Sequence, residues 1–74
     1  MRVKINLETT HDAIELAKIA TYVSGKVLIT DGNGLTVNAK SVMGALYALE
    51  FSDLWLESEK DIYSMISKFV KLED

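Results

Sequence analysis

The stretch VLITDGNGLTVNAKSVMG, residues 27–44, carries the most structural information in this chain. The apolar and β-branched runs Val27–Thr30 and Leu35–Asn38 are typical of strands, and Asp31–Gly34 separates them. Asp, Asn and Gly tolerate the positive φ angles of tight turns, so this spacer predicts a β-hairpin. Ser41 follows the second strand and is a preferred N-cap residue, so it predicts the start of a helix.

The helix predicted after the hairpin covers Ser41–Glu50. Its apolar face at helical spacing consists of Val42, Ala45, Leu46 and Leu49. Gly44 interrupts this segment, and glycine costs a helix interior about 1 kcal/mol relative to alanine. We therefore expect Gly44 to lie where another segment packs closely.

The residues before the hairpin predict a strand followed by a helix. Polar and apolar residues alternate from Arg2 to Leu7, which is the period of a half-buried strand. Thr9 and Asp12 then have the spacing of a capping box, and Gly25 is placed to end the helix. The apolar residues between them at helical spacing are Ala13, Leu16, Ala17, Ala20 and Val23.

The residues after position 52 repeat this order. Asp53–Glu57 predicts a fourth strand, with Leu54 and Leu56 on one side and Trp55 on the other. Ser58–Asp61 resembles a second capping box. The clearest amphipathic pattern in the chain follows it, formed by Ile62, Met65, Ile66, Phe69 and Val70.

The element order β-α-β-β-α-β-α predicts one α+β domain over residues 1–74. We expect an open-faced β-sandwich: a four-stranded antiparallel or mixed sheet with three helices on one face. Trp55 should lie on the uncovered face, beside a cross-strand neighbour such as Lys4 or Leu28. The same order also fits a ferredoxin-like small-molecule-binding domain with an appended helix, and strand order distinguishes the two.

Composition excludes several kinds of function. The chain has 74 residues, no cysteine, one histidine and a net charge of −3. Thiol chemistry is therefore absent, His11 alone cannot build a metal site, and nucleic acid is a disfavoured partner. No apolar run reaches the roughly 18 residues of a membrane span, and no signal peptide is recognisable. We expect a cytoplasmic protein with no cofactor and no enzymatic activity.

The segment VNAKSVMG, residues 37–44, resembles HPr, the phosphocarrier of the bacterial sugar phosphotransferase system. The element order extends the resemblance over nearly the whole chain, and residues 33–44 are close residue by residue. HPr-like carriers accept a phosphoryl group on a histidine within a glycine-apolar-histidine-small-arginine-proline motif. Here the corresponding stretch is NLETTHDAIEL, in which Thr9 falls at the histidine position, His11 at the arginine position and Asp12 at the proline position.

The resemblance therefore implies a divergent member without carrier chemistry. It also implies that Ser41 corresponds to the regulatory serine that a dedicated HPr kinase/phosphorylase modifies in some bacteria. The modified family member acts with a transcription regulator in catabolite repression. From the residues alone, Ser41 is a helix cap, and the two roles are compatible.

The apolar residues after this serine form a docking patch in the family, for enzyme I among others. The resemblance carries this role to Lys40, Val42, Met43 and Tyr47. A simpler interpretation is that Met43 and Tyr47 only cover the edge of the core. The remaining alternative keeps His11 as an irregular phosphoacceptor, because it lies near a helix N-terminus where an anion is favoured.

Overall fold

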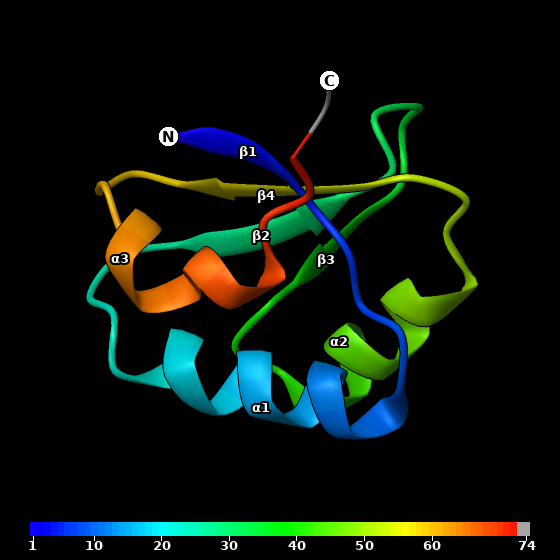
Figure 1. The fold of residues 1–74 in the computed structure, drawn as a ribbon, viewed down its shortest axis with the longest axis horizontal. Helices are drawn as coiled ribbons and strands as arrows, with labels where there is room; N and C mark the ends of the chain where they lie inside the picture. Colours follow the sequence, from blue (N-terminus) through cyan, green and yellow to red (C-terminus); the bar gives the residue numbers. More distant parts are fainter. Residues whose placement is uncertain (73–74) are drawn as a thin grey trace.

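The computed structural model describes residues 1–72, which form a four-stranded antiparallel sheet with three α-helices on one side (Figure 1). The predicted α+β class and open sheet are confirmed. The strand order is β1-β4-β2-β3. The strands are β1 (Arg2–Ile5), β2 (Val27–Thr30), β3 (Thr36–Asn38) and β4 (Leu54–Ser58).

The strand register sorts side chains onto two faces. On the helix side, Leu56 of β4 pairs with Ile29 of β2, and both side chains are fully buried. On the other face Trp55 lies between Lys4 of β1 and Thr30 of β2. The predicted neighbour Lys4 is confirmed, whereas Leu28 pairs with Glu57 instead. Alternation within β4 therefore places the only tryptophan on the uncovered face.

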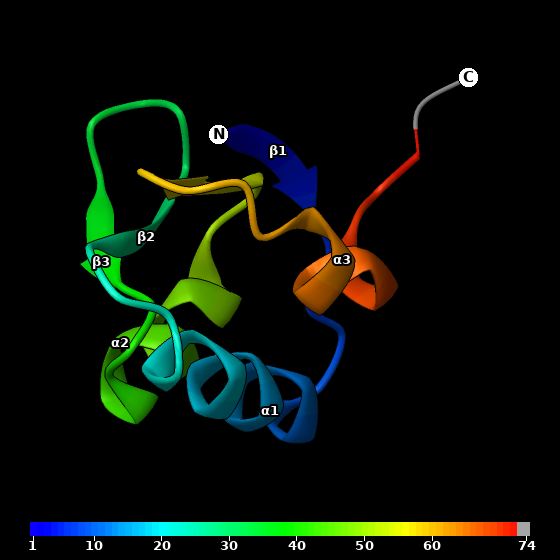
Figure 2. The ribbon, with the colours of Figure 1, turned by 90° about the vertical axis from the view of Figure 1, so that its left-hand side faces the viewer.

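Helices α1 (Thr10–Thr21), α2 (Val42–Tyr47) and α3 (Tyr63–Ile66) share one side of the sheet (Figure 2). The apolar face predicted from spacing is confirmed: Ala13, Leu16, Ala17 and Ala20 of α1 are buried, and so is Val23 just after the helix. The role predicted for Gly25 is wrong. Helix α1 ends at Thr21, and Gly25, with a φ of 90°, lies in the turn that leads to β2.

The predicted hairpin joins β2 to β3. Gly32 and Gly34 have φ angles of 76° and 108°, which glycine adopts without steric cost. The second strand begins at Thr36 rather than at Leu35. The reason is that the Leu35 carbonyl accepts bonds from Asp31 N, at 3.1 Å, and from Thr30 Oγ1, at 2.8 Å, which makes Leu35 part of the loop.

A helix forms where the amphipathic pattern Ile62–Val70 predicts one, but it is shorter than the pattern. Helix α3 has four residues, and a 3-10 turn over Ser67–Phe69 follows it. Val70 then forms an antiparallel bridge with Ile5, and Asn6 N donates to the Phe69 carbonyl at 2.8 Å. The helical pattern is therefore not continued to Val70, which pairs with β1 instead. The apolar positions Ile62, Ile66 and Phe69 are still buried in the core.

The second predicted capping box is also wrong. Ser58 is the last residue of β4, and its hydroxyl donates to the Lys60 carbonyl. Asp61 Oδ1 accepts from Tyr63 N at 3.0 Å, while the N-cap position, Ile62, has no side chain that can cap the helix.

The strand order distinguishes between the two topologies that the element order allows. A ferredoxin-like sheet has its first and third strands in the centre. Here β4 and β2 are central and β1 and β3 form the edges. The sheet is therefore not ferredoxin-like. Among residues 1–72, no helix combines the length and apolarity needed to cross a membrane.

Candidate functional site at the start of helix α2

The turn from β3 into α2 is organised by Asn38. Its side-chain Oδ1 accepts from Lys40 N at 2.9 Å, and its carbonyl accepts from Ser41 N at 3.1 Å. Ala39, between them, is fully buried and donates its N–H to the Val27 carbonyl at 2.8 Å. These bonds tie the turn to the sheet, so the positions of Lys40 and Ser41 are fixed by β2 and β3.

Ser41 is the N-cap of α2, as predicted. Its Oγ accepts from Gly44 N at 3.1 Å, and its carbonyl accepts the first helical bond from Ala45 N at 2.9 Å. The Ser41 side chain is half-buried. The hydroxyl therefore satisfies an amide that has no partner within the helix.

Gly44 marks a close approach between α2 and β3. A Cβ built on Gly44 would lie 2.6 Å from the Asn38 carbonyl oxygen and 3.5 Å from Asn38 N. The expected close packing is confirmed. The helix also covers the outer edge of β3 at Asn38. In an antiparallel pair, the backbone N–H and C=O groups of alternate residues point away from the partner strand. Because Ala39 bonds to Val27 of β2, the backbone groups of Asn38 point away from β2, toward α2.

The exposed side of α2 is apolar. The exposed fraction is 80% for Met43, 56% for Tyr47 and 44% for Val42. Val42 was predicted on the core face, but Ala45 and Ala48 occupy that face and are fully buried. We call Lys40, Ser41, Val42, Met43 and Tyr47 the α2 surface.

Tyr47 packs against a second aromatic residue. Its ring packs edge-on against Phe51, with centroids 5.8 Å apart. Phe51 in turn packs against the core cluster. The tyrosine is thus exposed yet held in place, which combines a fixed aromatic with the adaptable side chain of Met43.

His11 occupies a different kind of environment. It is the second residue of α1 and is exposed. The Thr9 hydroxyl accepts from Asp12 N at 3.2 Å, and Asp12 Oδ2 accepts from Glu8 N at 3.0 Å. The predicted capping residues are therefore both engaged, although Asp12 bonds one residue before the cap. An acidic side chain lies directly beside His11 in sequence.

The amine of Lys68, a residue distant in sequence, lies near the start of α1. Lys68 Nζ forms an ion pair with Glu15 Oε2 at 2.8 Å. Glu15 is one helical turn after His11 and so shares its side of α1. The 53 residues that separate Lys68 from Glu15 explain why sequence spacing does not reveal the pair.

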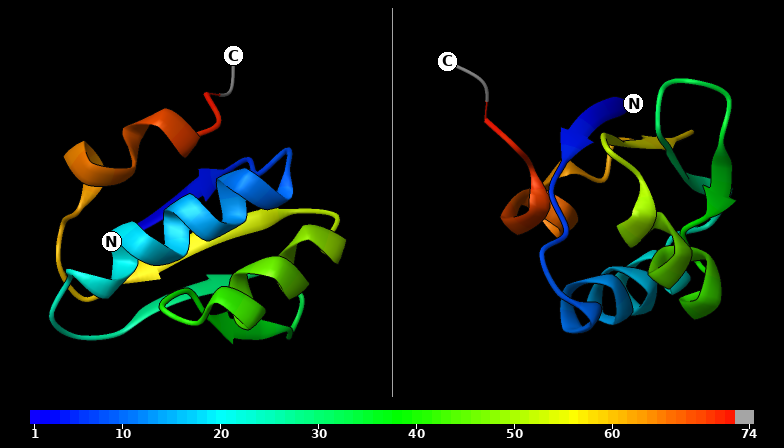
Figure 3. Two further views of the ribbon diagram at one scale, coloured as in Figure 1. Left: turned by 90° about the horizontal axis from the view of Figure 1, so that it is seen from below. Right: turned by 90° about the vertical axis from the view of Figure 1, so that its right-hand side faces the viewer.

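The structure does not bring His11 and Ser41 together. Helices α1 and α2 lie side by side and run in opposite directions (Figure 3). The start of α1 is therefore beside the end of α2, and the two candidate phosphoacceptors are at opposite ends of the helical layer. They form two independent sites.

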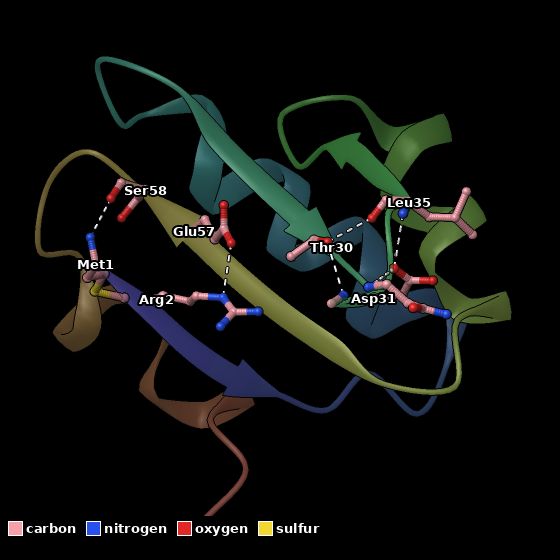
Figure 4. A network of polar contacts seen from close by, with 9 residues as sticks. Met1, Arg2, Thr30, Asp31, Leu35, Glu57 and Ser58 are labelled. Atoms are coloured by element: carbon pink, nitrogen blue, oxygen red, sulfur yellow. Dashed lines mark hydrogen bonds and ion pairs between the residues drawn. The ribbon is translucent and has the colours of Figure 1, made fainter.

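Trp55 belongs to a third cluster on the uncovered face. The Arg2 guanidinium carbon lies 4.5 Å from the Trp55 ring centroid, and Lys4 Nζ lies 5.6 Å from it. Arg2 also pairs with Glu57 at 3.0 Å (Figure 4). The only arginine of the chain is thus engaged on the face opposite α1 and cannot neutralise a group at His11.

Within residues 1–72 no group of three or more His, Cys, Asp or Glu side chains is arranged to hold a metal ion. The chain matches no protein-family model, and neither the curated proteins nor the solved structures contain a match to it.

Proposed function

We propose that this chain is an HPr-like interaction module that acts by docking a partner protein on the α2 surface, without phosphohistidine chemistry and without enzymatic activity. The observation that carries the proposal is the exposure of Met43 and Tyr47 on a helix whose start is bound firmly to the sheet. Exposed apolar side chains on a rigid element are typical of protein interfaces.

Two further observations support the HPr-like assignment. The sheet lacks the ferredoxin-like strand order, which removes the main competing topology for this element order. The segment that resembles the family, residues 37–44, also forms a compact unit in which Ser41 caps the helix and Gly44 packs on Asn38. In this unit the serine and the glycine of the lysine-serine-apolar-apolar-glycine run each have a structural role.

The surroundings of His11 support the proposal that carrier chemistry is absent. A phosphohistidine carries negative charge and needs a cation or free N–H groups beside it. Asp12 would add repulsion, and Arg2 is engaged with Trp55 and Glu57. We therefore place the function in recognition.

We further propose phosphorylation of Ser41 as the switch of the α2 surface. A phosphate would add a charge of about −1.5 to −2 beside Lys40 and next to exposed apolar residues. By family resemblance the partners are enzyme I, the HPr kinase/phosphorylase and a transcription regulator of catabolite repression, in the cytoplasm of a bacterium.

A second candidate keeps His11 as an irregular phosphoacceptor. The observation in its favour is Lys68, whose amine reaches α1 one turn from His11. Movement of that amine from Glu15 to a phosphoryl group would supply the missing positive charge.

One pair of reactions separates these functions. The protein is incubated with phosphoenolpyruvate and enzyme I, and separately with ATP and HPr kinase/phosphorylase, and phosphate is mapped by mass spectrometry. We expect acid-stable phosphate on Ser41 in the second reaction alone. Acid-labile phosphate on His11 would contradict the non-carrier function, and an unmodified Ser41 would contradict the switch.

Docking is tested by binding of the kinase to matched variants. Met43→Ser and Tyr47→Ser should weaken binding at least tenfold if these side chains are interface anchors, since such residues contribute about 1.4 kcal/mol or more. The controls are Met65→Ser and Tyr63→Ser, which remove the same residue types from exposed positions on α3. Equal losses in both pairs would rule out the α2 surface as the docking site.

A further inference from the structure

The tip of the β2–β3 hairpin contains an asparagine followed by glycine. Two side chains at the end of β2 hold this loop (Figure 4). Asp31 Oδ1 accepts from Asn33 N at 2.7 Å and from Leu35 N at 3.0 Å, and Thr30 Oγ1 accepts from Gly32 N at 3.1 Å. These bonds thus engage the backbone N–H groups on both sides of Gly34 but not the Gly34 N–H.

The Gly34 amide and the Asn33 side chain are unengaged. Within residues 1–72, no hydrogen bond involves the Gly34 N–H or the Asn33 side-chain amide. Both residues are exposed, and a Cβ placed on Gly34 would meet no atom within 4 Å. No other segment therefore covers Gly34, and its N–H is open to attack on the neighbouring Asn33 side chain.

We propose that Asn33 is a site of spontaneous deamidation, with water as the only co-reactant. Solvent base removes the Gly34 N–H proton, and the nitrogen attacks Asn33 Cγ. The new N–Cγ bond forms, the Cγ–Nδ2 bond breaks, and ammonia leaves. Water then opens the resulting succinimide at either carbonyl, which gives aspartate or isoaspartate at position 33.

The two other asparagines in residues 1–72 are protected. Asn38 is followed by Ala39, which is fully buried and whose N–H donates to the Val27 carbonyl at 2.8 Å, so the nucleophile is occupied. Asn6 is followed by Leu7, whose buried side chain restricts approach. Asn6 Nδ2 also donates to Glu8 Oε1 at 3.2 Å. These residues are internal controls within the same molecule.

Deamidation has a structural consequence for the uncovered face. Isoaspartate inserts an extra methylene into the backbone between the two amides that Asp31 holds, so both bonds cannot be kept. The product also adds a negative charge beside Asp31. Gly32, in the same loop, packs so closely on Trp55 that a Cβ there would lie 3.3 Å from its Nε1. A change in the loop therefore alters the surroundings of the only tryptophan.

The test is incubation of the folded protein at 37 °C in mildly alkaline buffer, followed by peptide mass mapping. We expect the mass gain of amide-to-acid conversion at Asn33, together with isoaspartate, while Asn6 and Asn38 remain amides. Asn33→Gln should abolish the gain, because its longer side chain forms the cyclic imide far more slowly. Equal conversion at Asn33 and Asn38 in the folded protein would overturn the proposal.

Tryptophan emission provides the second measurement. Conversion should shift Trp55 emission in step with the isoaspartate fraction. Asn33→Asp adds the charge without the extra methylene, so its emission should stay near that of the unmodified protein. An isoaspartate product with unchanged emission would contradict the predicted coupling between the loop and Trp55.

Discussion

Helices α1 and α2 begin with the same capping device in two different settings. In each, a hydroxyl oxygen accepts the N–H of the residue three positions later, at 3.2 Å for Thr9 and 3.1 Å for Ser41. That later residue is Asp12 in α1, with its carboxylate bonded to Glu8 N. In α2 it is Gly44, pressed against the Asn38 backbone.

The difference is one between local and tertiary stabilisation. The start of α1 is exposed and stabilised by its own neighbours in sequence. One of them is Asp12, whose negative charge is favourable at the positive end of the helix dipole. The start of α2 is stabilised by the strand that precedes it. The α2 surface is therefore held by the sheet, whereas the exposed His11 lies on a helix end whose caps are local. Rigid support favours recognition at α2.

Gly44→Ala tests the tertiary packing of the α2 start. Helix propensity alone predicts stabilisation by about 1 kcal/mol. Because the new methyl would lie 2.6 Å from the Asn38 carbonyl oxygen, we predict instead a net destabilisation of roughly 1–2 kcal/mol, in the range of overpacked cores. Chemical denaturation measures the sign directly.

The control for this variant is Met43→Ala, one residue earlier and exposed. It should change the free energy of unfolding by less than about 0.5 kcal/mol, as surface substitutions do. A Gly44→Ala protein as stable as the wild type would mean that α2 relaxes away from β3, and that both helix starts are locally stabilised.

The features predicted correctly from sequence are those that depend on near neighbours. The hairpin at Asp31–Gly34 follows from turn chemistry, and the buried face of α1 follows from spacing. The Ser41 cap follows from residue type and position. Each is specified by residues at most a few positions apart, so one sequence suffices.

The features missed or mispredicted depend on distant partners. The C-terminal pattern predicts a helix through Val70, but α3 ends at Ile66 and Val70 pairs with Ile5. The spacing of Lys68 and Glu15 reveals nothing about their ion pair. At the site, the sequence correctly predicts the N-cap at Ser41 and the close packing at Gly44. It missed Asn38, whose position two residues before Lys40 is the signal of an Asx turn.

The two caps should differ in strength. Ser41→Ala leaves the Gly44 N–H without a partner in a partly buried place, whereas Thr9→Ala exposes the Asp12 N–H to water. We predict losses of about 1–2 kcal/mol for Ser41→Ala and about 0.5–1 kcal/mol for Thr9→Ala, both within the range of N-cap substitutions. Because the sites lie at opposite ends of the helical layer, the double variant should lose the sum. A larger loss for Thr9→Ala would reverse the assignment of local and tertiary starts.

The smallest predicted effect tests the ion pair between Lys68 and Glu15, which connects α1 to the C-terminal segment. The side chains of Lys68 and Glu15 are 58% and 33% exposed, so solvent screens their attraction. Lys68→Ala should therefore cost only about 0.2–1 kcal/mol, and high salt should abolish the difference from wild type. Lys18→Ala, at an exposed position in the last turn of α1, is the matched control and should be neutral. A loss well above 1 kcal/mol that persists in salt would mean that Lys68 anchors α1 by packing. The first half of α1 would then be as firmly bound to the rest of the molecule as the start of α2. His11 would in that case lie on a preorganised helix end, which would favour it as a phosphoacceptor.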